Sequence, residues 1–160
     1  MEKKRQRILA LDPSSTETGY ACMNNLQGEV MVDNYGSIKA TGSHDLGRRL
    51  STIRESVEGL ISRNRPDVVV CEDQHGGVNQ KTLMTLREVV GVIRVLTYDY
   101  GADFVMYAPS TIKKEIAGHG RASKKRVKEN ISKMLEIEED IENDNITDAL
   151  SVGATYFSLY

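Results

Sequence analysis

A short apolar run that ends in an acid constrains the fold of this chain more than any other feature. Residues 8–11 are four apolar residues in a row, and Asp12-Pro13 follows them directly. Such a run suits a buried strand, and proline ends it because its ring removes the backbone donor that a sheet requires. The sequence therefore predicts a carboxylate fixed at the end of a buried strand. A simpler alternative is that Asp12 only opens a turn through its own side chain.

The same arrangement occurs a second time along the chain. Residues 67–71 include three consecutive valines and lead into Glu72 and Asp73. A continuous apolar run is typical of a strand that is buried on both faces, as in a parallel sheet. Parallel strands direct their carboxyl ends to one crevice, so we expect Asp12 and Glu72 to lie together if their strands are neighbours.

The remaining elements complete an α/β pattern. Further strands are predicted over 19–25 and 27–38, joined around Asn24-Asn25, and over 102–108. Apolar spacings of three and four predict helices over 45–64, 81–100, 111–117, 124–135 and 145–160. Ser43 or His44 is the expected start of the first helix, and Ser110 is the expected cap of the third. We expect a single domain over 1–160, with a mixed five-stranded sheet of three antiparallel strands followed by parallel strands, flanked by helices.

Cysteine usage and hydropathy indicate the compartment. Cys22 and Cys71 both lie in apolar runs, which is typical of buried thiols in a reduced, cytoplasmic protein rather than of a disulfide framework. No stretch approaches the roughly 20 apolar residues of a membrane helix. We therefore expect a cytoplasmic protein with no membrane partner.

A formal net charge of −2 conceals a strong segregation of charge. Residues 113–128 contain one acid, Glu115, and seven basic residues: Lys113, Lys114, Arg121, Lys124, Lys125, Arg126 and Lys128. Residues 136–148 contain acids and no base. This pattern suits an enzyme that binds a polyanion in one place and cations in another. A solvated helix face followed by an acidic loop explains the composition equally well.

A third acid, Asp148, lies near the start of the last predicted helix, one turn after Asn145. Together with Asp12 and Glu72 it makes a set of oxygen ligands without cysteine or histidine, which favours Mg²⁺ or Mn²⁺ over zinc. Two such cations about 3.5 to 4 Å apart support in-line displacement at phosphorus. The sequence therefore indicates phosphodiester hydrolysis.

Several of these segments resemble the RuvC-type Holliday junction resolvases, which are members of the RNase H-like superfamily. The similar segments are residues 8–13 with 18–20, residues 68–72, Tyr107-Ala108-Pro109 with Ile112-Lys113, Gly118-His119-Gly120, and Asp148-Ala149-Leu150. The match runs almost end to end. It implies a metal-dependent endodeoxyribonuclease that acts as a homodimer on four-way and other branched DNA, and no small-molecule substrate.

The resemblance also implies roles for individual residues. The expected catalytic residues are Asp12, Glu72, Asp148 and Asn145. The expected ligands of two Mg²⁺ ions, which Mn²⁺ can replace, are Asp12, Glu72, Asp148 and Asp144. The expected DNA-binding residues are His75, Asn79, Lys113, Lys124 and Lys125.

The chain departs from the family's pattern at two positions. Asn145 stands where relatives commonly have an acid or a histidine, and an amide offers a metal an oxygen but no charge. Either Asn145 suffices, or the neighbouring Asp144 supplies the charge, or activity is weakened. His75 stands where many relatives have an aromatic residue, so junction opening or sequence preference is expected to differ.

The predicted helix over 81–100 is apolar beyond one face, because Val89, Val92 and Leu96 widen its stripe. It is either deeply buried or packed on a second subunit, and the dimer that the resemblance implies favours the second interpretation. Two other functions are open: an RNase H-like nuclease that acts on RNA, and a junction-binding protein with weak catalysis. A sugar-kinase-like phosphate loop is disfavoured because 160 residues supply only one of the two lobes that such enzymes need.

Overall fold

The computed structural model describes residues 5–42, 44–74 and 77–160. Five strands form one mixed sheet in the order β3-β2-β1-β4-β5. Their bounds are Gln6–Asp12 for β1, Glu17–Leu26 for β2, Glu29–Lys39 for β3, Val68–Glu72 for β4 and Asp103–Tyr107 for β5. β1 pairs antiparallel with β2 and parallel with β4, while β2 and β3 are antiparallel and β4 and β5 are parallel. The predicted mixed five-stranded sheet is confirmed.

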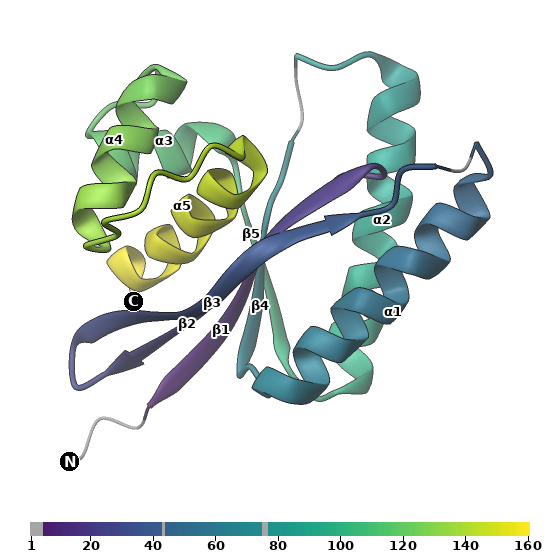
Figure 1. Cartoon of the computed structure of the whole chain (residues 1–160), viewed down its shortest axis with the longest axis horizontal. Helices are drawn as coiled ribbons and strands as arrows, with labels where there is room; N and C mark the ends of the chain where they lie inside the picture. The colour runs from purple at the N-terminus through teal and green to yellow at the C-terminus, as the bar shows by residue number, and fades with distance from the viewer. Residues whose placement is uncertain (1–4, 43, 75–76) are drawn as a thin grey trace.

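Helices cover both faces of this sheet (Figure 1). One face packs on α1, Leu46–Asn64, and α2, Gln80–Asp99. The other packs on α5, Asp144–Leu159, and on α3, Pro109–Ala117, and α4, Lys124–Met134. Side chains alternate along a strand, so Leu9 and Leu11 of β1 contribute to the α1–α2 core while Ile8 and Ala10 contribute to the core beneath α5.

Three local predictions are wrong in detail. The β2–β3 turn is at Gln27-Gly28 rather than Asn24-Asn25, and both turn residues have positive φ, as the tight turns favoured in hairpins require. Asp45 caps α1 by accepting a hydrogen bond from the Gly47 N–H, so His44 is not the cap, and Ser43 lies outside the described residues. Helix α3 begins at Pro109, which needs no N–H partner at that position, and not after a Ser110 cap.

Both cysteines are free and buried in the core, which fits their predicted role as small apolar residues. Within the described ranges, the structure contains no helix with the length and hydrophobicity that crossing a membrane would require.

Candidate active site

Asp12 and Glu72 end two neighbouring parallel strands on the same face of the sheet. Leu11 of β1 pairs with Cys71 of β4, and each acid is the next residue of its strand. Because side chains alternate along a strand, both acids point to the face beneath α5. Their carboxyl groups lie close enough that each shifts the pKa of the other. The structure therefore brings these two acids together at the edge where the sequence placed them.

Helix α5 carries a third acid to the same place. The helix approaches the sheet closely because Gly153 has no side chain, and a Cβ there would overlap the sulfur of Met23. Asp148, one turn into α5, is near enough to Asp12 and Glu72 that its charge raises the pKa of both. Three carboxylates from three separate elements thus share one region.

The start of α5 is anchored to strand β2 by a chain of hydrogen bonds. Asn143 caps the helix, since its Oδ1 accepts from the Asn145 N–H at 2.9 Å. The same side chain donates through Nδ2 to Glu17 Oε1 at 2.8 Å. Glu17 also accepts from Ser37 Oγ at 2.9 Å, so β2 and β3 both hold the cap in place. These bonds fix the end of α5 that carries the acids.

Gly19 completes this anchor beside the acid of β1. It pairs with Asp12 across the β1–β2 ladder. Its missing side chain leaves room for the backbone carbonyl of Asn145, which any Cβ at this position would overlap. The distance between α5 and Asp12 is therefore set by contact between two backbones.

Burial and like charge raise the pKa of all three acids. Asp12 is only 6% exposed, and burial, followed by the charges of Asp148 and Glu72, raises its pKa to about 9. Burial is also the main cause that raises the pKa of Glu72 and of Asp148. The ammonium group of Lys124 opposes this rise at each acid. Without a bound cation, the site therefore favours the protonated form of these acids.

Within the described residues, no three acidic, histidine or cysteine side chains are arranged so that they could hold a metal ion together. Asp148 instead lies 3.9 Å from the Nζ of Lys124, so the predicted three-ligand centre is only partly assembled. The chemistry of the donors still fits a hard divalent cation. They are carboxylate oxygens, and the raised pKa values of Asp12 and Glu72 mark a charge that a cation would stabilise.

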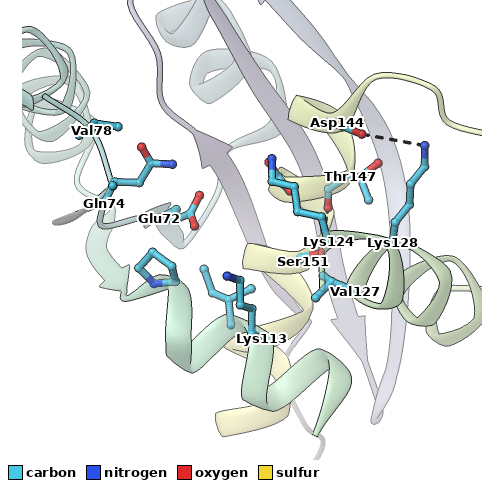
Figure 2. Close-up of a pocket in the computed structure, with 14 residues that line it drawn as sticks. Glu72, Gln74, Val78, Lys113, Lys124, Val127, Lys128, Asp144, Thr147 and Ser151 are labelled. Atoms are coloured by element: carbon cyan, nitrogen blue, oxygen red, sulfur yellow. Dashed lines mark hydrogen bonds and ion pairs between the residues drawn. The ribbon is translucent and has the colours of Figure 1, made fainter. Parts of the chain in front are cut away.

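A cavity of about 300 Å³ opens beside the acids at the carboxyl edge of the sheet. Glu72 and Gln74 face Lys124 across it, and Lys113 enters from α3 (Figure 2). Lys128 extends along another side and forms an ion pair with Asp144 at 4.0 Å. Carboxylates beside a ring of lysines can receive a phosphate and hold a cation next to it.

Asp144 and Asn145, the two alternatives for a fourth metal-site residue, occupy different positions. Asp144 lines the cavity together with Asp148, one turn further along α5, and its charge contributes to the raised pKa of Asp148. Asn145 is not among the residues that line the cavity, and its backbone carbonyl faces Gly19 of β2. Asp144 therefore lies on the cavity wall, whereas Asn145, like Asp12, is not among the described residues that line the cavity.

Only some of the predicted DNA-binding residues line the cavity. Lys113 and Lys124 line the cavity, whereas Lys125 is exposed and is not part of its lining. Asn79 is the N-cap of α2, where its Oδ1 accepts from the Thr82 N–H at 2.8 Å. His75 lies outside the described residues.

Four further residues with polar side chains line the cavity and were not predicted as site residues: Gln74, Lys128, Thr147 and Ser151. Thr147 and Ser151 continue a polar stripe that begins at Asp144 and includes Asp148, with helical spacings of three, four and seven. Residues with that spacing share one face of a helix. The spacing of these polar residues therefore could have predicted that Thr147 and Ser151 lie on the same helix face as Asp148.

The raised pKa of Asp12 predicts how the metal-free protein responds to pH. The pKa of Asp12 is 3.8 for a free side chain and about 9 in the folded protein. Between these pH values the folded state binds more protons than the unfolded state, so the stability of the fold falls as pH rises. From pH 5 to 8 we expect a loss of about 2 to 4 kcal/mol in EDTA, measured by urea denaturation. Asp12→Asn should remove most of this slope, while Asp140→Asn, in the acidic linker, should keep it. Equal slopes in the wild type and Asp12→Asn would contradict the prediction.

Comparison with known proteins gives one consistent result. The family model described as "Crossover junction endodeoxyribonuclease RuvC" matches residues 8–156. The crossover junction endodeoxyribonuclease RuvC of Chloroherpeton thalassium is 32% identical over 145 residues, which is 91% of this chain and 78% of the relative. The protein of the same name from Caldicellulosiruptor saccharolyticus is 32% identical over 148 residues, covering 92% of this chain and 89% of the relative.

A solved structure shares the fold. Thermus thermophilus RuvC in complex with a Holliday junction substrate superposes with a TM-score of 0.86 at 22% identity, covering 94% of this chain and 92% of that one. This likeness extends over the sheet and the helices on both of its faces.

Proposed function

The chain belongs to the crossover junction endodeoxyribonuclease RuvC family, and we propose that it resolves four-way DNA junctions by hydrolysing phosphodiesters. The observation that carries this proposal is the pairing of the buried Asp12 with the half-buried Glu72, which lines the same cavity as Lys113 and Lys124. Buried acids of this kind suit a cation, and lysines suit the phosphate on which it acts.

The catalytic roles follow from the chemistry of each side chain. Divalent metal held by Asp12, Glu72 and Asp148 would supply an activated water and stabilise the departing 3′ oxygen. We assign two Mg²⁺ ions to the site, with Mn²⁺ as a substitute, and Asp144 as the fourth carboxylate. The ends of β1 and β4 hold the first two acids rigidly, and Lys124 balances Asp148 when no cation does so.

Lys113 and Lys124 are proposed to bind the phosphates on either side of the cleaved bond. Replacing either with Ala should weaken binding of junctions of any sequence and reduce the slope of log affinity against log salt by about one unit. Gel-shift titrations over a range of salt concentrations measure that slope. Lys133→Ala, at the opposite end of α4, is the matched control and should leave it unchanged. If the slope is unchanged in both variants, the basic residues of 113–128 form a solvated helix face that does not contact DNA.

A homodimer through α2 is the proposed assembly. Leu86 and Ile93 of this helix face the core, but Val95 and Tyr98 are 60% and 84% exposed. Next to them, a hollow of about 640 Å³ between α1 and α2 is lined by the apolar Val92, Val95 and Leu96 and by charged residues of both helices. Exposed apolar groups around a hollow are typical of an association surface, and two-fold symmetry suits paired cuts. We call this region the α2 surface.

Charge placed on the α2 surface should separate the subunits. Val95→Glu is expected to convert a dimer into a monomer at micromolar concentration, because an unpaired carboxylate would be buried at the interface. Sedimentation equilibrium measures the change. Met31→Glu introduces the same charge at a similarly exposed apolar residue of β3 and should leave the dimer intact. A monomeric wild type at that concentration would contradict the assembly.

One experiment tests the function directly. The protein is incubated with a synthetic four-way junction, a linear duplex and an RNA–DNA hybrid, each with and without Mg²⁺. We expect symmetric nicks in the junction alone and only with Mg²⁺. Cleavage of the hybrid would favour an RNA nuclease, and junction binding without cleavage would favour a binding protein.

A further inference from the structure

A second cavity adjoins the one beside the acids. It has a volume of about 230 Å³ and shares Gln74 with the first cavity. Four separate segments line it: the β1–β2 connection, helix α1, Gln74 after β4, and the first turns of α2. Its polar lining consists of Ser14, Ser15, Arg49, Lys81, Thr82 and Thr85, together with Gln74. We call it the Lys81 cavity.

The two cavities differ in chemistry. The lining of the first includes the carboxylates of Glu72, Asp144 and Asp148. The Lys81 cavity has no carboxylate among its described lining residues, and it combines two cationic side chains with four hydroxyl groups. Lysine, arginine and hydroxyl groups are the usual partners of backbone phosphate in DNA. The described lining of the Lys81 cavity therefore presents an anion with cationic and hydroxyl groups only, whereas the first cavity combines its lysines with three acids.

The walls of the Lys81 cavity are held in place by the protein itself. In the β1–β2 connection, the Ser14 N–H donates to Thr18 Oγ1 at 3.1 Å, and Thr18 Oγ1 donates to the Ser14 carbonyl at 2.9 Å. On the opposite wall, Asn79 fixes the start of α2 through the Thr82 N–H. Because these two wall segments are already fixed, a ligand loses little binding free energy in ordering them.

The position of the cavity identifies its ligand. It lies next to the cavity beside the acids, and Lys81, Thr82 and Thr85 belong to the helix that carries the α2 surface. A strand whose scissile phosphate is bound beside Asp12 and Glu72, and which continues along α2, would reach this cavity next, because the two cavities share Gln74. We propose that the Lys81 cavity binds the DNA sugar-phosphate backbone at phosphates adjacent to the scissile one, on the α2 side. This inference rests on the proposed function and extends it to the path of the strand.

Lys81→Ala is the variant that tests the inference, because its side chain is exposed and its loss should not disturb the core. Losing one phosphate contact should reduce the salt slope of junction binding by about one unit, and Lys81→Arg should restore it. Lys39→Ala, a lysine of β3 outside this cavity, is the matched control. A slope that is unchanged in Lys81→Ala, or reduced equally in Lys39→Ala, would overturn the inference.

A methylphosphonate, which carries no charge, can locate the contact. The affinities of the wild type and of Lys81→Ala are measured for a series of junctions, each with one methylphosphonate at a different position. We expect the wild type to lose affinity for a methylphosphonate within about three phosphates of the cleaved bond, on one side only, and Lys81→Ala to be insensitive to that substitution. Sensitivity shared by both proteins at every position would overturn the inference. Mg²⁺-dependent cleavage by the wild type is scored on the unmodified junction, so failure of this inference is distinguishable from failure of the proposed function.

Discussion

Asp12→Asn and Glu72→Gln should each reduce junction cleavage by about a thousandfold or more while leaving junction affinity within a few-fold of the wild type. Each substitution keeps the shape of the side chain but removes the charge that holds a cation beside the scissile phosphate. Affinity depends mainly on lysine contacts to phosphates, which these changes do not touch. Single-turnover nicking and gel-shift affinity, measured in parallel in Mg²⁺, give the two quantities.

Two controls interpret that result. Asp140→Asn removes an exposed acid of the linker before α5 and should retain full cleavage. Asp144→Asn removes an acid on the cavity wall and should raise the Mg²⁺ concentration for half-maximal cleavage without abolishing it, because Asp12 and Glu72 remain. Full activity of Asp12→Asn or Glu72→Gln would remove that residue from the metal site. A parallel loss of affinity would show that the substitution had disturbed the fold.

The meeting of Asp12 and Glu72 was predictable because two local patterns combine with a general rule. Each acid ends an apolar run, and parallel strands bring their carboxyl ends to one edge. Alternation along the strands then puts both side chains on one face once the register is known. The register itself, Leu11 opposite Cys71, is a contact between residues far apart in sequence, and no local pattern specifies it.

The surroundings of Asp148 were less predictable. Its ion pair with Lys124 joins α5 to α4, and it depends on how the two helices pack rather than on the propensity of either segment. The choice between Asp144 and Asn145 likewise depends on where α5 begins. The cap is Asn143, whose side chain also reaches Glu17 of β2, and this long-range bond sets the rotation of the helix. Sequence spacing alone places both Asp144 and Asn145 about one turn before Asp148, and only the packing of α5 puts Asp144 on the cavity wall.

Gly19→Ala should damage the site more than the addition of a single methyl group suggests. A Cβ at this position would overlap the carbonyl oxygen of Asn145, and a backbone group cannot rotate away as the end of a side chain can. Either β2 or the start of α5 must move, at a cost of about 1 to 3 kcal/mol in the free energy of unfolding. The movement shifts Asp148 relative to Asp12, so we expect cleavage to fall by about tenfold to a hundredfold, since a displacement of about 1 Å is enough for that loss.

The same substitution at Gly59 separates this positioning effect from the general cost of an added methyl group. A Cβ at Gly59 would lie 2.9 Å from the terminal nitrogen of Arg63, which is the end of a flexible side chain. Alanine also favours the helical conformation over glycine by about 1 kcal/mol, so Gly59→Ala should be neutral or stabilising and fully active. In Gly19→Ala, the Mg²⁺ requirement should rise even at temperatures where urea denaturation shows the protein fully folded. If cleavage by folded Gly19→Ala needs no more Mg²⁺ than the wild type, contact between β2 and α5 does not set the position of Asp148.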